Sequence, residues 1–274
     1  MIIVKVDVVI LTKNSEKILE ECLRSIFREI PICHLIVEDA YSTDNTIKIL
    51  GEFSQKYRNI LVNQTNVKLG KARELGIKKV DTDWFIFIDS DVILSKNWFT
   101  KMCEHLKENR EKIGAIESNH IHHYPNNTPI FPEFKGVANQ VYNGKRTDTR
   151  ALTIATLLKT EAVKNISIPD DLQIYEDEFI RRYVESQGYI WHKASDPIID
   201  HYPTPRPWRD AYLAGKYSAR YHFISPVRII IVSIFFPVKL IYFWIRSGSL
   251  RASINSVIYS FYMLKGLLSG ILRI

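Results

Sequence analysis

Two aspartates, Asp89 and Asp91, directly follow the apolar run Trp84–Ile88. Residues two apart in an extended segment point to the same side of the backbone, so both carboxylates face the same volume. Paired oxygen ligands of this kind are typical of sites for Mg²⁺ or Mn²⁺, which commonly join carboxylates to the phosphates of a substrate. A third aspartate, Asp39, follows another short apolar run, His34–Val37. The pattern favours a Mn²⁺ or Mg²⁺ site over the alternative, a polar turn after a buried strand.

The elements that must position these aspartates alternate between two periodicities in the first hundred residues. Runs of β-branched and other apolar residues predict strands at 4–11, 34–37, 59–63 and 84–88. Helical spacing of apolar residues and capping residues predict helices at 15–29, 42–57 and 70–80. This alternation indicates an α/β fold, in which ligands bind beyond the carboxyl ends of the strands. Thr12, Asp39 and the Asp89/Asp91 pair stand at three of those ends.

Three segments together resemble the family 2 glycosyltransferases in their order and spacing. These segments are 9–14, 36–46 and 84–92, and the last contains the Asp89-Ser90-Asp91 motif. The resemblance covers about residues 5–202. It implies the GT-A fold, which is an α/β fold with a Rossmann-like mixed sheet. It also implies an inverting transfer of a sugar from a nucleotide-diphosphate donor.

The resemblance also assigns roles to individual residues. Asp39 is expected to hydrogen-bond the nucleotide base, and the 70–76 segment is expected to border the donor. The residues expected to contact the donor are Thr12, Asn14, Asp39, Lys71, Arg73, Asp89 and Ser90. Asp89 and Asp91 are expected to hold the metal and diphosphate, with His201 as a further ligand. The alternative for a single histidine at a strand end is a structural role.

Three consecutive acids, Glu176, Asp177 and Glu178, match the Glu-Asp motif of the same family. Asp177 takes the position of the general base. An inverting transfer is a single displacement, and a carboxylate within hydrogen-bond reach of the acceptor hydroxyl must take its proton. The alternative is that the three acids only stabilise the first turn of a helix through its dipole.

Two other patterns are weaker indications of a site. His120, His122 and His123 lie on an expected strand or loop, where only two of the three side chains share a face, so we expect no metal site there. Gly70 and Gly76 match neither a dinucleotide-binding loop nor a phosphate-binding P-loop.

The charge of the chain is concentrated at one end. The 274 residues carry a formal net charge of +7. Residues 200–274 hold ten basic and two acidic residues, a net +8, which leaves −1 for residues 1–199. Prolines at 203, 205 and 207 mark the boundary, so we predict a catalytic domain at 1–205 and a helical tail at 206–274.

The tail contains two apolar stretches, 227–245 and 254–272. If the first stretch forms one helix, kinked at Pro237, its cations at 228, 239 and 246 lie within about 20° of one line. This predicts two membrane-associating helices that lie in the interface with their cations toward anionic headgroups. The alternatives are a spanning hairpin and a packing or oligomer surface. The aliphatic residues at helical spacing argue against nucleic acid as the partner.

Composition predicts where such a protein would act. Its three cysteines form no CxxC pair, which favours a reducing compartment, and we expect no signal peptide from residues 1–7. We therefore expect a peripheral protein at the cytoplasmic face of the cell membrane.

The sequence favours a metal-dependent glycosyltransferase that moves a sugar to a lipid-linked glycan. Polyprenyl-phosphate mannose synthases carry Asp-Ala-Asp-Leu-Gln after the fourth strand, whereas this chain has Asp-Ser-Asp-Val-Ile at 89–93. That difference favours a sugar hydroxyl as the acceptor. The alternatives are a polyprenyl (dolichyl)-phosphate sugar synthase and a catalytically silent subunit that binds sugar nucleotides.

Overall fold

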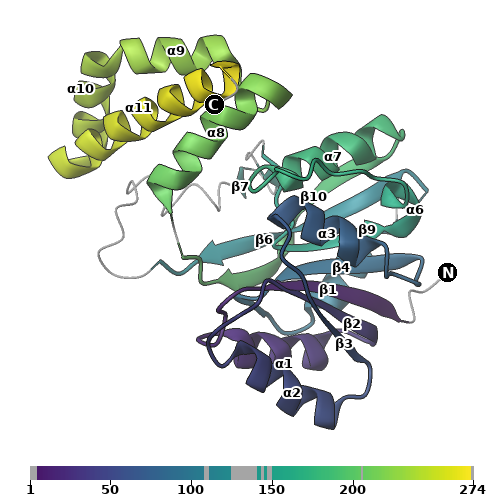
Figure 1. Cartoon of the computed structure of the whole chain (residues 1–274). Helices are drawn as coiled ribbons and strands as arrows, with labels where there is room; N and C mark the ends of the chain where they lie inside the picture. Colours follow the sequence, from purple (N-terminus) through teal and green to yellow (C-terminus); the bar gives the residue numbers. More distant parts are fainter. Residues whose placement is uncertain are drawn as a thin grey trace. The chain divides into compact units, whose positions relative to one another are not determined.

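The computed structural model describes residues 5–107, 111–124, 141–142, 145–146, 150–204 and 206–272. The chain divides into two compact units. The sheet unit comprises Met1–His123, Asn139–Leu172 and Glu176–Tyr202. The helical unit comprises Tyr124–Ala138, Gln173–Tyr175 and Pro203–Ile274. Figure 1 shows the mixed sheet of the first unit and the helices of the second.

The sheet unit is built on eight strands in the order β3-β2-β1-β4-β9-β6-β10-β5. The strands are β1 (Val6–Thr12), β2 (Ile32–Asp39), β3 (Ile60–Gln64), β4 (Trp84–Asp89), β5 (Val92–Leu94), β6 (Ile113–His122), β9 (Ala155–Lys159) and β10 (Ile190–His201). Strands β3, β2, β1 and β4 pair in parallel, whereas β9 is antiparallel to both of its neighbours. A separate ribbon pairs β7 (Val141–Tyr142) with β8 (Lys145–Arg146). The predicted α/β fold with a mixed sheet is confirmed.

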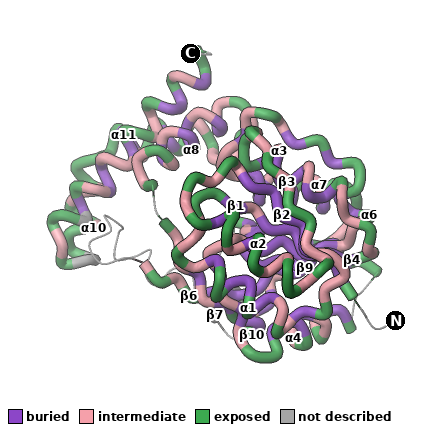
Figure 2. Tube along the Cα trace, turned by 60° about the horizontal axis from the view of Figure 1, so that its bottom comes forward, coloured by how far each residue is buried: buried purple, intermediate pink, exposed green. Residues whose placement is uncertain are grey.

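Helices cover both faces of this sheet (Figure 1). They are α1 (Leu19–Glu29), α2 (Thr46–Lys56), α3 (Leu69–Ile77), α4 (Trp98–Glu104), α6 (Thr160–Val163) and α7 (Glu176–Ser186). The apolar stripe of α1 is fully buried with Val8 and Ile10 in one core, and a Cβ atom on Gly76 of α3 would meet Val9, the residue between them. The central strands are therefore buried on both faces, as Figure 2 shows, which explains their continuous apolar runs.

The register of the strands brings the polar strand ends together. Thr12 at the end of β1 pairs with Asp39 of β2, and Leu11 pairs with Asp89 of β4. On the other side of the sheet, His201 at the end of β10 pairs with Val92, one residue after Asp91. The sheet thus brings candidate residues of four strands together at the carboxyl ends of those strands.

The helical unit consists of α8 (Pro207–Tyr221), α9 (Pro226–Ile234), α10 (Phe236–Ser247) and α11 (Leu250–Leu272). Glycines let α8 and α11 approach each other closely. A Cβ atom on Gly266 would lie 1.8 Å from the backbone oxygen of Tyr212, and one on Gly215 would lie 1.9 Å from that of Met263. Such close backbone approach is typical of small residues at helix interfaces.

The prediction of one helix over 227–245 is wrong. Helices α9 and α10 are bent by 77° relative to each other, and they meet at Phe235. Pro237 does not cause the break, because it lies in the first turn of α10, where its missing N–H is tolerated.

The predicted line of cations along that helix is therefore also wrong. Because the helix is broken, Lys239 turns toward α11 and donates to the backbone oxygen of Ser256 at 2.9 Å and to Ser260 Oγ. Within the described part of the chain, no single helix is both long and apolar enough to cross a membrane. Helices α9 and α10 meet such a criterion only as a bent pair.

Candidate functional site

An acidic cluster with a histidine forms at the carboxyl ends of the strands. Asp89 ends β4, Asp91 lies in the turn before β5, and His201 ends β10. One ligand atom from each of these residues lies within 4.8 Å of the other two. His201 Nε2 is 3.3 Å from Asp91 Oδ1. We call these three residues the carboxyl-end cluster. Two carboxylates and an imidazole suit Mn²⁺, and the carboxylates alone also suit Mg²⁺.

The electrostatics of the cluster favour a cation. Burial raises the pKa of the Asp89 carboxyl, the Arg73 guanidinium opposes this effect, and the Asp91 carboxylate adds to it. The pKa of Asp89 therefore lies above its ordinary value. A divalent cation in contact with both aspartates would favour their ionised forms.

Arg73, a predicted donor contact, joins this cluster to α7. Its side chain is 3% exposed, and its Nη2 donates to Asp89 Oδ1 at 2.9 Å. Its Nε donates to Glu176 Oε1 at 3.3 Å. Its Nη1 is buried and has no hydrogen-bond partner among the described residues. The guanidinium thus retains a donor next to the carboxyl-end cluster.

A second histidine, which the sequence analysis did not assign to the site, supports His201. His122 Nδ1, from β6, lies 3.0 Å from His201 Nδ1. Burial lowers the pKa of His122, His201 adds to this effect and Asp91 opposes it, and the resulting pKa is about 4. With its Nδ1 occupied, His201 directs Nε2 toward Asp91, as outer-shell partners commonly orient metal-binding histidines.

Asp39 organises the ends of β1 and β2. It is fully buried, and its oxygens accept hydrogen bonds from Thr12 Oγ1 at 2.8 Å, from the N–H and hydroxyl of Ser42, and from Gln64 Nε2 at 3.1 Å. Burial alone would raise the pKa of this carboxyl, but these hydrogen bonds outweigh it and hold the pKa below its ordinary value. The expected contact of Asp39 with a nucleotide base stays a prediction.

The remaining donor-contact predictions fall into two groups. Asn14 has a positive φ of 51° and accepts from the backbone N–H of Thr43 at 2.8 Å, so it connects the loop after β1 to the loop after β2 that contains Ser42. Ser90, the middle residue of the Asp89-Ser90-Asp91 motif, has its Oγ 2.8 Å from Ser15 Oγ. Lys71 instead pairs with Glu74 at 3.0 Å and with Asp170 at 3.3 Å.

Asp177, the predicted base, lies in the first turn of α7 and is nearly buried. Its Oδ1 accepts from the N–H of Glu178 at 2.7 Å, and its Oδ2 lies 3.3 Å from Arg150 Nη2. Arg150 was not predicted from the sequence, because no local motif connects two residues 27 positions apart. Burial raises the pKa of the neighbouring Glu176, Asp177 adds to this effect while Arg73 opposes it, and the resulting pKa is about 7.

A mixed sheet with an Asp-x-Asp motif at its carboxyl edge defines a GT-A-like protein. Residues 7–157, more than half of the chain, match the family described as Glycosyl transferase family 2. The chain belongs to this family.

Relatives with curated names include poly(ribitol-phosphate) glycosyltransferases. The chain is 30% identical over 115 residues to a poly(ribitol-phosphate) beta-glucosyltransferase of Bacillus spizizenii, which covers 40% of this chain and 18% of the relative. It is 24% identical over 240 residues to the poly(ribitol-phosphate) beta-N-acetylglucosaminyltransferase TarS of Staphylococcus aureus, covering 84% of this chain and 40% of TarS. The chain thus spans less than half the length of these relatives.

Solved structures share the fold at low identity. The mannosyltransferase PcManGT from Pyrobaculum calidifontis, in complex with GDP-Man and Mn²⁺, is 14% identical with a TM-score of 0.66, over 97% of this chain and 87% of that one. S. aureus TarS 1–349 in complex with UDP-GlcNAc is 17% identical with a TM-score of 0.56, over 94% of this chain and 90% of that one.

Proposed function

We propose that this chain is a metal-dependent, inverting glycosyltransferase that takes a sugar from a nucleotide-diphosphate sugar. The observation that carries the proposal is the convergence of Asp89, Asp91 and His201 within 4.8 Å at the carboxyl edge of a family 2 sheet. These residues would hold Mn²⁺ or Mg²⁺, which when bound neutralises charge on a leaving diphosphate. PcManGT with GDP-Man and Mn²⁺ is the structural precedent for this pairing of donor and metal.

The side chains around the cluster would divide the remaining work. Arg73 Nη1 offers a buried cationic donor to the diphosphate, while Thr12, Asn14 and Asp39 order the loop expected to bind the nucleoside. The acceptor hydroxyl attacks the anomeric carbon, and its proton passes to the Asp177 carboxylate. As the new C–O bond forms, the bond to the diphosphate breaks, and the nucleoside diphosphate leaves with the electron pair. Arg150 holds the Asp177 carboxylate in place.

We propose a lipid-linked glycan as the acceptor and the cytoplasmic membrane face as the site of action. The support for a membrane surface is the helical unit, where large apolar side chains of α9 and α10 are exposed, among them Ile245 at 79%. A polyol-phosphate polymer is a second candidate acceptor. The names of the poly(ribitol-phosphate) glycosyltransferases among the relatives favour it.

Transfer of radiolabelled sugar tests the activity directly. A thermal-shift screen of UDP-, GDP- and TDP-sugars with Mn²⁺ first identifies the donor. Transfer from that donor to membrane extracts and to poly(ribitol phosphate) then identifies the acceptor. We expect transfer to require Mn²⁺ or Mg²⁺ and to fall about 10²- to 10⁴-fold in Asp177→Asn. Full activity in EDTA would contradict the metal role. Nucleotide binding without transfer to any acceptor would favour a silent binding subunit.

A further inference from the structure

The helical unit contains a cavity with both apolar and cationic walls. Its volume is about 330 Å³, and residues of α9, α10 and α11 line it. Helices α9 and α10 both lie against α11 (Figure 1). Most of the wall is aliphatic or aromatic. The polar side chains that line it are Arg228, Ser233, Lys239, Ser256 and Ser260.

The polar side chains of this cavity suit an anion. Lys239 is half-buried, with its ammonium 2.9 Å from the backbone oxygen of Ser256 and 5.6 Å from the centre of the Phe243 ring. Ser256 is 2% exposed, and its Oγ has no hydrogen-bond partner among the described residues. A buried hydroxyl without a partner is unfavourable, so a ligand that hydrogen-bonds to it is favoured.

The charge of the surrounding sequence has one sign. Among the described residues that line the cavity, the charged ones are Arg228 and Lys239, and both are basic. Residues 211–274 contain no aspartate or glutamate at all. A complementary ligand for this cavity therefore carries negative charge.

An open apolar groove adjoins the cavity. It has a volume of about 450 Å³ and shares Val232, Lys239 and Phe243 with the cavity. Its other walls are Ile231, Phe235, Val238 and Tyr242, all of them exposed. Free phosphate would leave this apolar surface in contact with water, whereas a hydrocarbon chain in the groove would cover it, which is favourable.

We propose that the cavity and groove bind one anionic phospholipid, with its phosphate at Lys239 and Ser256 and an acyl chain along the groove. Lys239 and the Ser256 hydroxyl donate hydrogen bonds to the phosphate oxygens, and Arg228 contributes a second positive charge. The proposal rests on the membrane location in the proposed function, but it is independent of sugar transfer. It gives the helical unit a specific lipid site in addition to general attraction to a negative surface.

Native mass spectrometry of the full chain, released from nanodiscs, tests the site. With phosphatidylglycerol nanodiscs we expect one retained lipid per chain, and at least tenfold less retention in Lys239→Met. The matched control is Lys265→Met, which removes an exposed cation of α11 that does not line the cavity. We expect that variant to retain lipid as the wild type does. Ser256→Ala, a milder change at a helical position, should lower retention several-fold while leaving the melting temperature within a few degrees.

Four results would overturn the lipid site. They are no retained lipid on the wild type, equal losses in Lys239→Met and Lys265→Met, equal retention of phosphatidylcholine, and displacement of phosphatidylglycerol by millimolar inorganic phosphate. Dimers that form without lipid and disappear in Lys239→Met would instead assign the groove to a second copy of the chain, and would overturn the proposal too.

A separate readout keeps this proposal apart from the proposed function. Donor hydrolysis in detergent, measured as nucleotide release, should be the same in Lys239→Met and in the wild type. If no variant turns over any donor but lipid retention still depends on Lys239, the lipid site stands and the glycosyltransferase proposal fails. If the wild type turns over a donor but retains no lipid, the glycosyltransferase proposal stands and the lipid site fails.

Discussion

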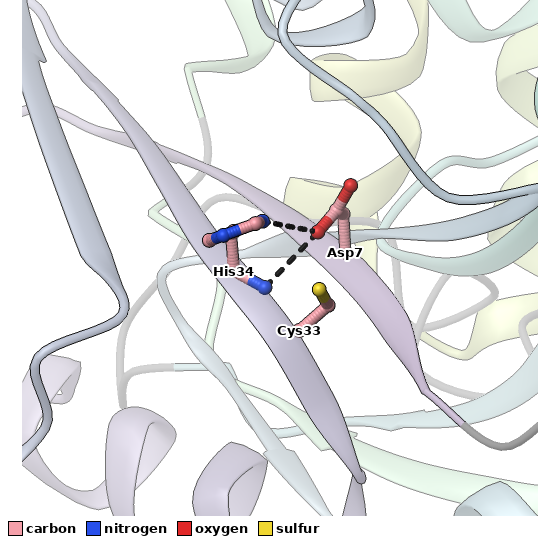
Figure 3. Close-up of side chains that lie close together, drawn as sticks. All are labelled: Asp7, Cys33 and His34. Carbon is pink, nitrogen blue, oxygen red and sulfur yellow. Dashed lines mark hydrogen bonds and ion pairs between the residues drawn. The ribbon is translucent and has the colours of Figure 1, made fainter.

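The sheet unit brings an aspartate and a histidine together at both ends of its central strands. At the amino ends, ligand atoms of Asp7, Cys33 and His34 lie within 4.8 Å of one another, as they do in the carboxyl-end cluster. We call these three residues the amino-end cluster. Figure 3 shows its side chains on two neighbouring strands, with Asp7 hydrogen-bonded to His34. Distances alone therefore do not distinguish the two clusters.

The hydrogen bonds that each aspartate accepts do distinguish them. Asp7 is fully buried, and one of its oxygens accepts from the N–H and Nδ1 of His34, at 3.0 and 3.1 Å. Its other oxygen accepts from the N–H groups of Asp81 and Thr82, at 2.8 and 3.1 Å. The Asp91 side chain, by contrast, is 34% exposed, and among the described residues its carboxylate forms one ion pair, with His201. The Asp7 carboxylate uses both oxygens to connect strands and loops, whereas the Asp91 carboxylate is available to a ligand.

Asp91→Asn should show the largest effect. It removes one charge from the carboxyl-end cluster without leaving a buried donor unpaired. We expect sugar transfer to fall about 10³-fold, because the loss of a metal ligand removes several kcal/mol of charge stabilisation. The melting temperature without metal should change by no more than a few degrees. Steady-state transfer and thermal unfolding of the same preparation measure both quantities, and a variant with wild-type turnover would place the metal elsewhere.

Asp7→Ala should produce the reverse pattern. It leaves four donors, two of His34 and the N–H groups of Asp81 and Thr82, without their acceptor, at about 1–3 kcal/mol for each one that stays buried. We expect the free energy of unfolding to fall by about 3 kcal/mol or more, with turnover per folded molecule unchanged.

Urea unfolding of Asp7→Ala measures this loss. Cys33→Ala is the matched control, because Cys33 belongs to the same cluster but its side chain is not one of the donors to Asp7. A turnover defect in Asp7→Ala at temperatures where the protein stays folded would show that the amino-end cluster takes part in function.

The sequence predicts the carboxyl-end cluster better than the amino-end cluster, for a physical reason. The Asp89-Ser90-Asp91 motif is local, and the apolar run before it identifies the buried strand and therefore its carboxyl end. Asp7 lies within an apolar run and gives no such signal. Its partners His34 and Asp81 are 27 and 74 residues away, and only the register of β1 with β2 brings the first of them near.

Distance along the sequence also explains why other contacts of the carboxyl end of the sheet were not predicted. His122 and Arg150 act on His201 and Asp177 across 79 and 27 residues, through strand pairing and loop packing that no periodicity encodes. In the tail, one helix kinked at Pro237 was predicted for residues 227–245, and the break at Phe235 invalidates every angle counted across it. Local chemistry was thus predictable, and long-range partners were not.

Added metal should stabilise the protein through the carboxyl-end cluster and not through the amino-end cluster. The expected effect is smaller than that of the two substitutions above. At 100 times its dissociation constant, a cation that binds only the folded chain stabilises it by about 2.7 kcal/mol. We expect Mn²⁺ to raise the melting temperature of the wild type and of Cys33→Ala by the same amount, and to leave that of Asp91→Asn unchanged. If Cys33→Ala loses the response and Asp91→Asn keeps it, the amino-end cluster is the metal site.

The smallest expected effect is a pair of opposite pH dependences around the carboxyl-end cluster. The pKa of His122, about 4, lies below the value of 6.5 for an unfolded chain. Between pH 6.5 and 4 the unfolded chain therefore binds the extra proton, and the free energy of unfolding falls as the pH falls. The pKa of Glu176, about 7, lies above its unfolded value of 4.5. Between pH 4.5 and 7 the folded chain holds that proton, and the free energy of unfolding falls as the pH rises.

In the wild type the two slopes oppose each other between pH 4.5 and 6.5, and each is limited to about 1.4 kcal/mol per pH unit for one proton. His122→Asn should therefore lose stability more steeply as the pH rises through this window. Glu176→Gln should instead gain stability as the pH rises. Urea unfolding at half-unit pH steps in EDTA measures both slopes. Changes of the same sign in the two variants would show that His122 and Glu176 are not the groups that make the carboxyl end of the sheet sensitive to pH.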